Sequence, residues 1–119
     1  MEDCVFCKII NKELPGKIVY EDDVVIALVP IDIVNKGHTL LIPKKHFKNI
    51  LDVDSDVFKH FGEVLRILSI KLMKDNDAEG VNILNANNEV AGQSVMHLHF
   101  HIIPRYKEDG LDLWIKQKL

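Results

Sequence analysis

The chain has 119 residues, of which 47% are hydrophobic and 28% are charged, and its formal net charge is −3 at pH 7. This length predicts a single domain over residues 1–119, and the hydrophobic fraction is large enough for a packed core. The composition argues against an intrinsically disordered chain, and the weakly negative charge argues against a protein that coats long nucleic acids. A pocket for one nucleotide needs no overall positive charge.

The first half of the chain predicts a short helix and three strands. Residues 4–10 are apolar with a helical rhythm, and a Leu-Pro-Gly sequence follows that ends the helix. Residues 17–29 contain two runs rich in Val and Ile, with a hairpin turn expected at residues 21–23. After a loop, residues 38–43 are expected to form a third strand that a proline closes.

The second half predicts one long helix and two more strands. Residues 54–74 begin with an N-cap aspartate and show one apolar face at helical spacing. Residues 81–85 predict the fourth strand, and residues 96–103 predict a fifth that Pro104 ends. The predicted fold is therefore α+β, with a five-stranded, mostly antiparallel sheet, one long helix and a short N-terminal helix. Trp114 is expected either to anchor an interface or to fill the core of the monomer.

The N-terminal segment, MEDCVFCKII, predicts the cellular compartment. It carries two acidic residues and no long apolar run, so it does not resemble a secretory signal. No stretch of the chain approaches the roughly 20 apolar residues of a membrane span. We therefore expect a reducing cytoplasm, in which Cys4 and Cys7 are thiols or metal ligands rather than a structural disulfide.

The sequence HLHFHIIPR places a histidine at every second position, at His97, His99 and His101. Alternate side chains of a strand share a face, so three imidazoles about 7 Å apart are expected on one face, with apolar residues on the opposite, core face. Three interpretations follow: a polar strand face, a three-histidine metal site, or catalysis by groups that titrate near neutrality.

A small turn rich in hydrogen-bond donors, Gly92-Gln93-Ser94, lies immediately upstream of the histidines. Glycine permits close approach of backbone N–H groups to an anion, and an amide and a hydroxyl can donate to phosphate oxygens. Next to imidazoles, this turn indicates a phosphoryl or nucleotidyl site, and the alternative is an ordinary loop. Taken singly, His38 and His46 are typical of polar surface.

The spacing Cys4-x-x-Cys7 is half of a typical zinc site. Two other interpretations are a redox pair and two apolar-leaning thiols on a metal-free helix. The strand–CxxC–helix order of thioredoxin-like proteins is absent from the predicted elements, which disfavours the redox pair.

Four segments, in the same order, resemble motifs of the histidine-triad (HIT) family. They are CVFCKII at residues 4–10, GHTLLIPKKH at residues 37–46, AGQSV at residues 91–95 and the alternating histidines of residues 97–103. The N-terminal segment is similar to that of the small bacterial-type branch. The resemblance implies a nucleotide-binding hydrolase or transferase that acts at the α-phosphorus of a nucleotide.

The resemblance also assigns roles by position. It implies that His99 is the nucleophile and that His101 and His38 support the phosphate. A neutral imidazole suits the first role, because its Nδ1–H can donate to a backbone carbonyl while its Nε2 faces phosphorus. The residues implied to bind the nucleotide are Phe6, Ile9, Leu28, Ile31, Asp32, Asn87, Gly92, Gln93 and Ser94.

Two positions depart from the family pattern. Many members carry an acidic residue for the ribose hydroxyls where this chain has Pro30, and Asp32 is expected to substitute for it. An Asn or Gln is usual where this chain has Ala86, and Asn85 or Asn87 is expected to reach into the site instead. These departures concern sugar recognition and substrate choice more than the chemistry.

His46 and His97 occupy positions that bind zinc in some histidine-triad relatives, so the resemblance implies a site made of Cys4, Cys7, His46 and His97. Such a closed tetrahedral set would make the zinc structural. We therefore expect a cytoplasmic homodimer that hydrolyses nucleoside 5′-phosphoramidates of a purine, as an adenosine 5′-monophosphoramidase does, without membrane or extended nucleic-acid partners. The alternatives are a dinucleoside polyphosphate hydrolase and a nucleotide-binding, zinc-stabilised interaction protein with little turnover.

Overall fold

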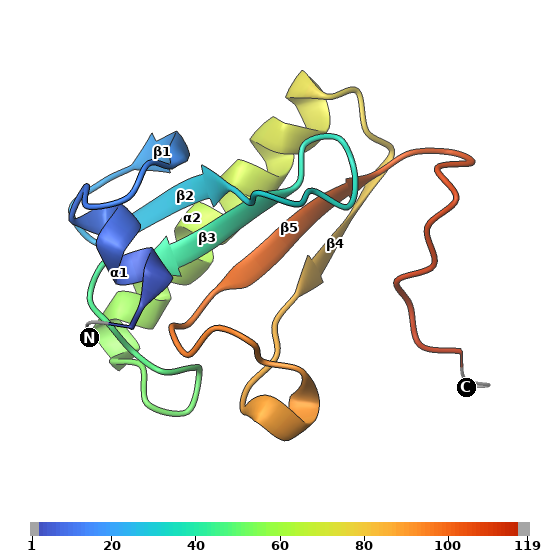
Figure 1. Ribbon diagram of the computed structural model, residues 1–119. Coiled ribbons are helices and arrows are strands. Elements are labelled where there is room, and N and C mark those ends of the chain that lie inside the picture. Colours follow the sequence, from blue (N-terminus) through green and yellow to red (C-terminus); the bar gives the residue numbers. More distant parts are fainter. Residues whose placement is uncertain (1–2, 117–119) are drawn as a thin grey trace.

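A five-stranded antiparallel sheet with the strand order β1-β2-β3-β5-β4 organises the computed structural model, which describes residues 3–116 (Figure 1). Each strand pairs antiparallel with its neighbours, and β3 and β5 occupy the interior of the sheet beside β2. The strands are β1 (Lys17–Glu21), β2 (Val25–Val29), β3 (Thr39–Pro43), β4 (Gly80–Leu84) and β5 (Phe100–Arg105).

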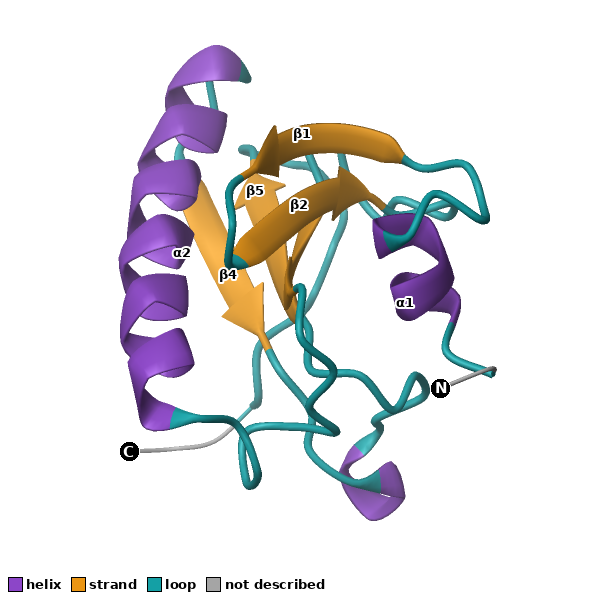
Figure 2. Cartoon of the chain, turned by 90° about the vertical axis from the view of Figure 1, so that its left-hand side faces the viewer, coloured by secondary structure: helices purple, strands orange, loops and turns teal. Residues whose placement is uncertain are grey.

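Helices cover the sheet on both sides (Figure 2). The long helix α2 (Ser55–Asp75) packs on one face, the short helix α1 (Val5–Ile10) lies over the β1–β3 part of the other, and a single 3₁₀ turn forms η1 (Glu89–Ala91). Because both faces of β2 are covered, the strand is apolar at nearly every position rather than alternating. Val25 and Ala27 pack in the cluster with α2, whereas Ile26 and Leu28 pack in the cluster with α1.

These elements confirm the predicted fold class. The side chain of Asp54 caps α2 by accepting a hydrogen bond from the N–H of Asp56, and Asp22 organises the β1–β2 turn by accepting from two backbone N–H groups. Within residues 3–116, none of the helices combines the length and the apolar character that crossing a membrane requires. The cytoplasmic location stays a prediction.

The fifth strand differs from its predicted bounds. Pairing begins only at Phe100 and continues to Arg105, so residues 96–99 precede the strand, with a bend at residues 95–97, and Pro104 lies within the strand. Pairing with β3 ends at Ile102, so Pro104 has only β4 as a neighbour and is tolerated as at a sheet edge. Trp114 is 71% exposed, which excludes a place in the core of this chain.

Candidate active site and metal-binding cluster

The three alternating histidines have three different surroundings. His97 is fully buried and donates its Nε2–H to the carbonyl of Pro43 at 2.8 Å, which leaves Nδ1 as an unprotonated nitrogen. His99 donates Nδ1–H to the carbonyl of His97 at 2.8 Å, so its Nε2 carries a lone pair, as the sequence led us to expect. The neutral form of the middle imidazole is therefore oriented with an unprotonated outer nitrogen, which is the form that a nucleophile requires.

His101 belongs to a separate hydrogen-bonded chain. The backbone N–H of Val34 donates to Nδ1 of His38 at 3.1 Å, so a neutral His38 carries its proton on Nε2. That proton faces Nδ1 of His101 at 3.0 Å, so a neutral His101 in turn presents Nε2–H as a donor. Val34 and His38, both in the loop that precedes β3, thus determine which nitrogen of His101 can donate to an anionic oxygen.

Burial keeps this histidine chain neutral. It lowers the pKa of His101 to about 4, with the positive forms of His99 and His38 adding to the shift, and it also lowers the pKa of His38. Both rings are therefore uncharged near pH 7, which is the state that the hydrogen-bond directions require. Neutral donors bind a phosphate without trapping it as a tight ion pair.

Phe6 on α1 packs between the rings of His97 and His99. Its ring contacts His97 and His99 edge to face, with centroid separations of 5.8 and 5.3 Å. The rings of His99 and His101 are 5.3 Å apart, so Phe6 covers one side of His99 while His101 occupies another. Such packing restricts the His99 ring to few orientations.

A cavity of about 810 Å³ lies between α1 and the end of β2. Of these rings only that of Phe6 lines the cavity, and the predicted catalytic residues His38, His99 and His101 are absent from its lining. Six of the predicted nucleotide-binding residues line it, namely Phe6, Ile9, Leu28, Ile31, Asp32 and Ser94. Ile31 is nevertheless 100% exposed, so it forms a rim rather than a wall, and Pro30 lies beside it. Leu40 and Val95 also line the cavity, although neither was predicted to bind the nucleotide, because nothing in their residue type separates them from core or loop positions.

Three predicted residues, Asn87, Gly92 and Gln93, are absent from the lining of this cavity. The amide nitrogen of Gln93 donates to the carbonyls of Lys48 and Val95, and its amide oxygen accepts from Asn88, so the expected donation to phosphate does not fit this arrangement. The N–H of Gly92 donates to the carbonyl of Glu89 within the same turn. Of the three residues of this turn, only Ser94 lines the cavity, and this residue is exposed.

The two asparagines near Ala86 face different partners. Asn85 donates its amide to the carbonyl of His99 at 3.0 Å, and Asn87 accepts from the N–H of Ile50 at 2.8 Å. Because His99 precedes the paired part of β5, the side chain of Asn85 supplies a backbone hydrogen bond that the sheet does not. Neither asparagine lines the cavity.

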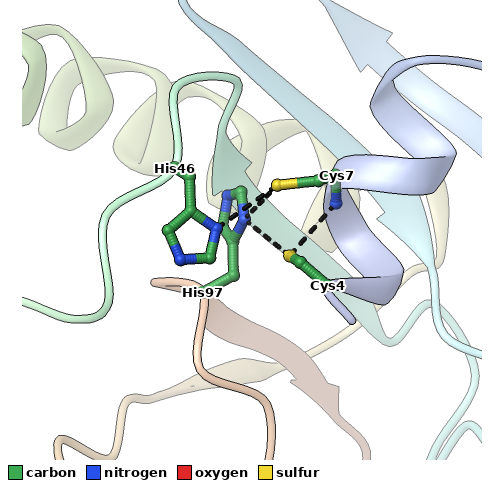
Figure 3. A group of neighbouring side chains, drawn as sticks. All are labelled: Cys4, Cys7, His46 and His97. Carbon is green, nitrogen blue, oxygen red and sulfur yellow. Dashed lines mark hydrogen bonds between the residues drawn. The ribbon is translucent and has the colours of Figure 1, made fainter. Parts of the chain in front are cut away.

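Cys4, Cys7, His46 and His97 converge at the N-terminus of α1 (Figure 3). Their sulfur and nitrogen atoms all lie within 4.8 Å of one another. Nδ1 of His97 is 3.2 Å from the Cys4 sulfur and 3.5 Å from the Cys7 sulfur, and Nδ1 of His46 is 3.3 Å from the Cys7 sulfur. The bond lengths of a tetrahedral zinc site place such S···N pairs about 3.6 Å apart.

The chemistry of this donor set also fits a metal dication. Nε2–H of His97 donates to a backbone carbonyl, and such a hydrogen bond commonly orients an imidazole that binds a metal through its other nitrogen. Burial raises the pKa of Cys7 to about 11, with Cys4 adding to the shift, so the Cys7 thiol stays protonated unless a cation replaces the proton. The four residues could therefore hold a zinc ion with little rearrangement.

Comparison with known proteins places this chain in a family. The sequence model of the HIT domain matches residues 11–108. An uncharacterized HIT-like protein of Methanocaldococcus jannaschii is 48% identical over 107 residues, covering 90% of this chain and 82% of that protein. Adenosine 5′-monophosphoramidase HNT1 of Candida albicans is 34% identical over 109 residues, covering 88% of this chain and 72% of that enzyme.

The fold gives the same assignment. The crystal structure of SMU.412c from Streptococcus mutans superposes with a TM-score of 0.93 at 39% identity, covering 100% of this chain and 76% of that one. The match spans the whole chain and so includes α1 and the other segments that carry the site described above. The chain therefore belongs to the HIT family, a family of nucleotide-binding proteins and nucleotide hydrolases.

Proposed function

We propose that this chain hydrolyses purine nucleoside 5′-phosphoramidates, through a covalent nucleotidyl intermediate on His99. The observation that carries the proposal is the hydrogen bond from His99 Nδ1–H to the carbonyl of His97, which leaves Nε2 of the neutral ring free for attack. Phe6, whose ring contacts that of His99, lines a nucleotide-sized cavity. The phosphoramidase activity named for the Candida albicans relative supports the choice of substrate.

The reaction would proceed in two displacements. Nε2 of His99 forms a bond to the α-phosphorus while the bond from phosphorus to the leaving amine breaks, and the amine takes a proton from water. Water then attacks the phosphorus, the phosphorus–Nε2 bond breaks, and the proton of the attacking water passes to solvent as the monophosphate leaves. Nε2–H of His101 would donate to a phosphoryl oxygen as negative charge grows on it.

The cavity supports the recognition of a nucleotide. Phe6, Leu28 and Leu40 present apolar surface for a purine, and the hydroxyl of Ser94 would donate to the phosphate at the other end. Asp32 lies in the lining and would accept from the ribose hydroxyls in place of the residue replaced by Pro30.

Zinc would be held by Cys4, Cys7, His46 and His97 and would supply a structural tie rather than a catalytic charge. The tie would join α1 to the segment that precedes β5, and so to the carbonyl that orients His99. No step of the proposed reaction needs the ion, because His99 attacks directly.

The proposal is tested by incubating the purified protein with adenosine 5′-phosphoramidate and following release of the monophosphate. Turnover supports it. Tight binding of the monophosphate without turnover would favour the nucleotide-binding protein with little activity. Faster cleavage of diadenosine polyphosphates than of the phosphoramidate would favour the other hydrolase branch.

We also propose that two copies associate through the outer side of β4 and α2. Within the described chain β4 has one strand neighbour, β5, so its other edge can pair with an identical strand about a two-fold axis. Apolar side chains border this edge, because Ile70 is 56% and Ile83 43% exposed and both line a shallow groove between helix and strand. A self-complementary apolar edge fits an isologous dimer.

Replacing Ile70 by glutamate is expected to shift the protein from dimer to monomer, since burying a carboxylate in an apolar interface is costly. Sedimentation velocity would show the change, with an apparent dissociation constant raised by about 100-fold or more. Val19→Glu, on the opposite edge strand β1, is the matched control and should leave the dimer intact. A monomeric wild type would contradict the proposed association.

A further inference from the structure

Three amide side chains form a buried cluster behind the Ser94 turn. In this amide cluster, Nδ2 of Asn49 donates to Oδ1 of Asn88 at 2.9 Å and to Oε1 of Gln93 at 3.2 Å. Asn49 is 2% exposed and Gln93 is 3% exposed, although both are strongly polar. Burying such groups costs free energy unless every polar atom has a hydrogen-bond partner, so apolar side chains would fill this space at a lower cost.

The cluster satisfies its polar atoms by holding backbone on both sides of Ser94. Oε1 of Gln93 accepts from the N–H of Asn88 at 2.7 Å, and its Nε2 donates to the carbonyl of Val95 at 3.0 Å. The same Nε2 donates to the carbonyl of Lys48, next to Asn49 in sequence. Ser94 therefore lies between Gln93, whose side chain points inward, and Val95, whose carbonyl accepts a hydrogen bond from Gln93.

The backbone at Asn88 shows that this turn is held against a local preference. Its φ of 75° and ψ of 156° lie in a region that is essentially restricted to glycine. A residue with a side chain stays there only where its surroundings compensate for the strain. Two hydrogen bonds compensate for this strain. Nδ2 of Asn49 donates to the side chain of Asn88, and the N–H of Asn88 donates to Oε1 of Gln93.

The segment that carries Asn49 also reaches the nucleophile. The N–H of Ile50 donates to Asn87, whose amide nitrogen donates to Asn85, which in turn donates to the carbonyl of His99. One short segment after β3 thus contacts both the turn that presents Ser94 and the amide chain that fixes the backbone of His99.

We propose that Asn49 is a positioning residue of the active site, which acts through Gln93 and Asn88 to keep the Ser94 hydroxyl at the wall of the nucleotide cavity. This inference rests on the proposed function. It explains why the turn brings one hydroxyl to the cavity while the amide of Gln93 turns away from it. It also explains the strained backbone of Asn88, because a turn with relaxed dihedral angles would move the Ser94 hydroxyl away from the cavity wall.

The test compares binding of adenosine with binding of adenosine monophosphate. Asn49→Ala is expected to lower kcat/KM for the phosphoramidate by about 10- to 100-fold, mainly through kcat, since a shift of about 1 Å in a positioning group has effects of this size. Affinity for the monophosphate should fall by about 10-fold, whereas affinity for adenosine should change less than about 2-fold. Only a displaced phosphate contact predicts this difference between the two ligands.

Val64→Ala is the control for stability alone. Val64 is a buried residue of α2 and packs in the core on the face of the sheet opposite to α1. This substitution should lower the melting temperature without changing either affinity. Asn88→Gly removes the strain, so in that background Asn49→Ala should cost less activity than it does in the wild-type chain. Asn49→Ser, which can keep one donated hydrogen bond, serves the same comparison where the alanine variant does not fold.

The proposal is overturned if Asn49→Ala and Asn49→Ser lower the melting temperature as Val64→Ala does but leave kcat and monophosphate affinity unchanged. Equal losses of adenosine and monophosphate affinity would also overturn it, because they would indicate general damage to the cavity. A wild-type protein that binds no monophosphate overturns the proposed function itself. A wild type that binds monophosphate without turnover still tests Asn49 through the two affinities.

Discussion

Replacing His99 by asparagine is expected to lower kcat/KM for adenosine 5′-phosphoramidate by about 10⁴-fold or more, which is the scale of losing a nucleophile. The amide of asparagine lacks the imidazole Nε2 that would bond to phosphorus, while the neighbouring donors remain in place. A rapid acid quench followed by mass spectrometry should detect a nucleotidyl adduct on the wild-type chain and none on the variant. Circular dichroism and monophosphate binding should show that the variant is folded.

His60→Asn is the matched control. His60 lies on α2, with its Nε2 2.7 Å from the carboxylate of Asp22, and it lies outside the cavity. Its loss should leave kcat/KM within about 2-fold, because surface changes away from special features have small effects. Retained turnover by His99→Asn, together with no adduct on the wild type, would refute the proposed nucleophile.

Replacing both Cys4 and Cys7 by serine is expected to abolish zinc binding and to lower the melting temperature by about 10 °C or more. Half of the four donor atoms would be lost, and Cys4 is nearly buried at the start of α1. Protein purified without added zinc should contain close to one zinc per chain by elemental analysis, and the double variant almost none. A chelator should destabilise the wild type but not the variant.

The control for this experiment is Ile10→Ala, which weakens the packing of α1 without touching the cluster. It should lower the melting temperature and still respond to chelator as the wild type does. Zinc well below one per chain, with a melting temperature that chelation leaves unchanged, would rule out the structural metal. Any fall in the activity of the double variant should come from displacement of α1, because Phe6 on this helix contacts the ring of His99.

Much of the fold was predictable because strong periodic signals lie in its core. The apolar face of α2 and the apolar runs of β2 and β3 predict their elements within a few residues of the observed bounds. The fifth strand shows the limit of such signals. Residues 96–99 alternate as a strand does, but the chain bends at residues 95–97, and alternation cannot tell whether a neighbouring strand is there to pair with the segment.

The site was predictable to the extent that residue type decides the chemistry. The alternating imidazoles limited the function to three classes, and the resemblance to the HIT family then separated their roles. Gln93 could not be placed in this way, because an amide beside a glycine suits a ligand and a buried turn equally well. Two of its partners are Lys48 and Asn49, which only tertiary packing brings close.

The order in which the protein folds follows from the small size of α1. Six residues are too few for a helix that is stable by itself in water, so α1 depends on the partners that it meets in the finished structure. Cys4 meets His97 across 93 positions of the chain, and Phe6 meets His99 across a similar distance. A ribosome must therefore release the chain as far as His99 before the cavity beside Phe6 gains this wall. Binding of a ligand in that cavity should therefore appear only after the segment that precedes β5 has been made.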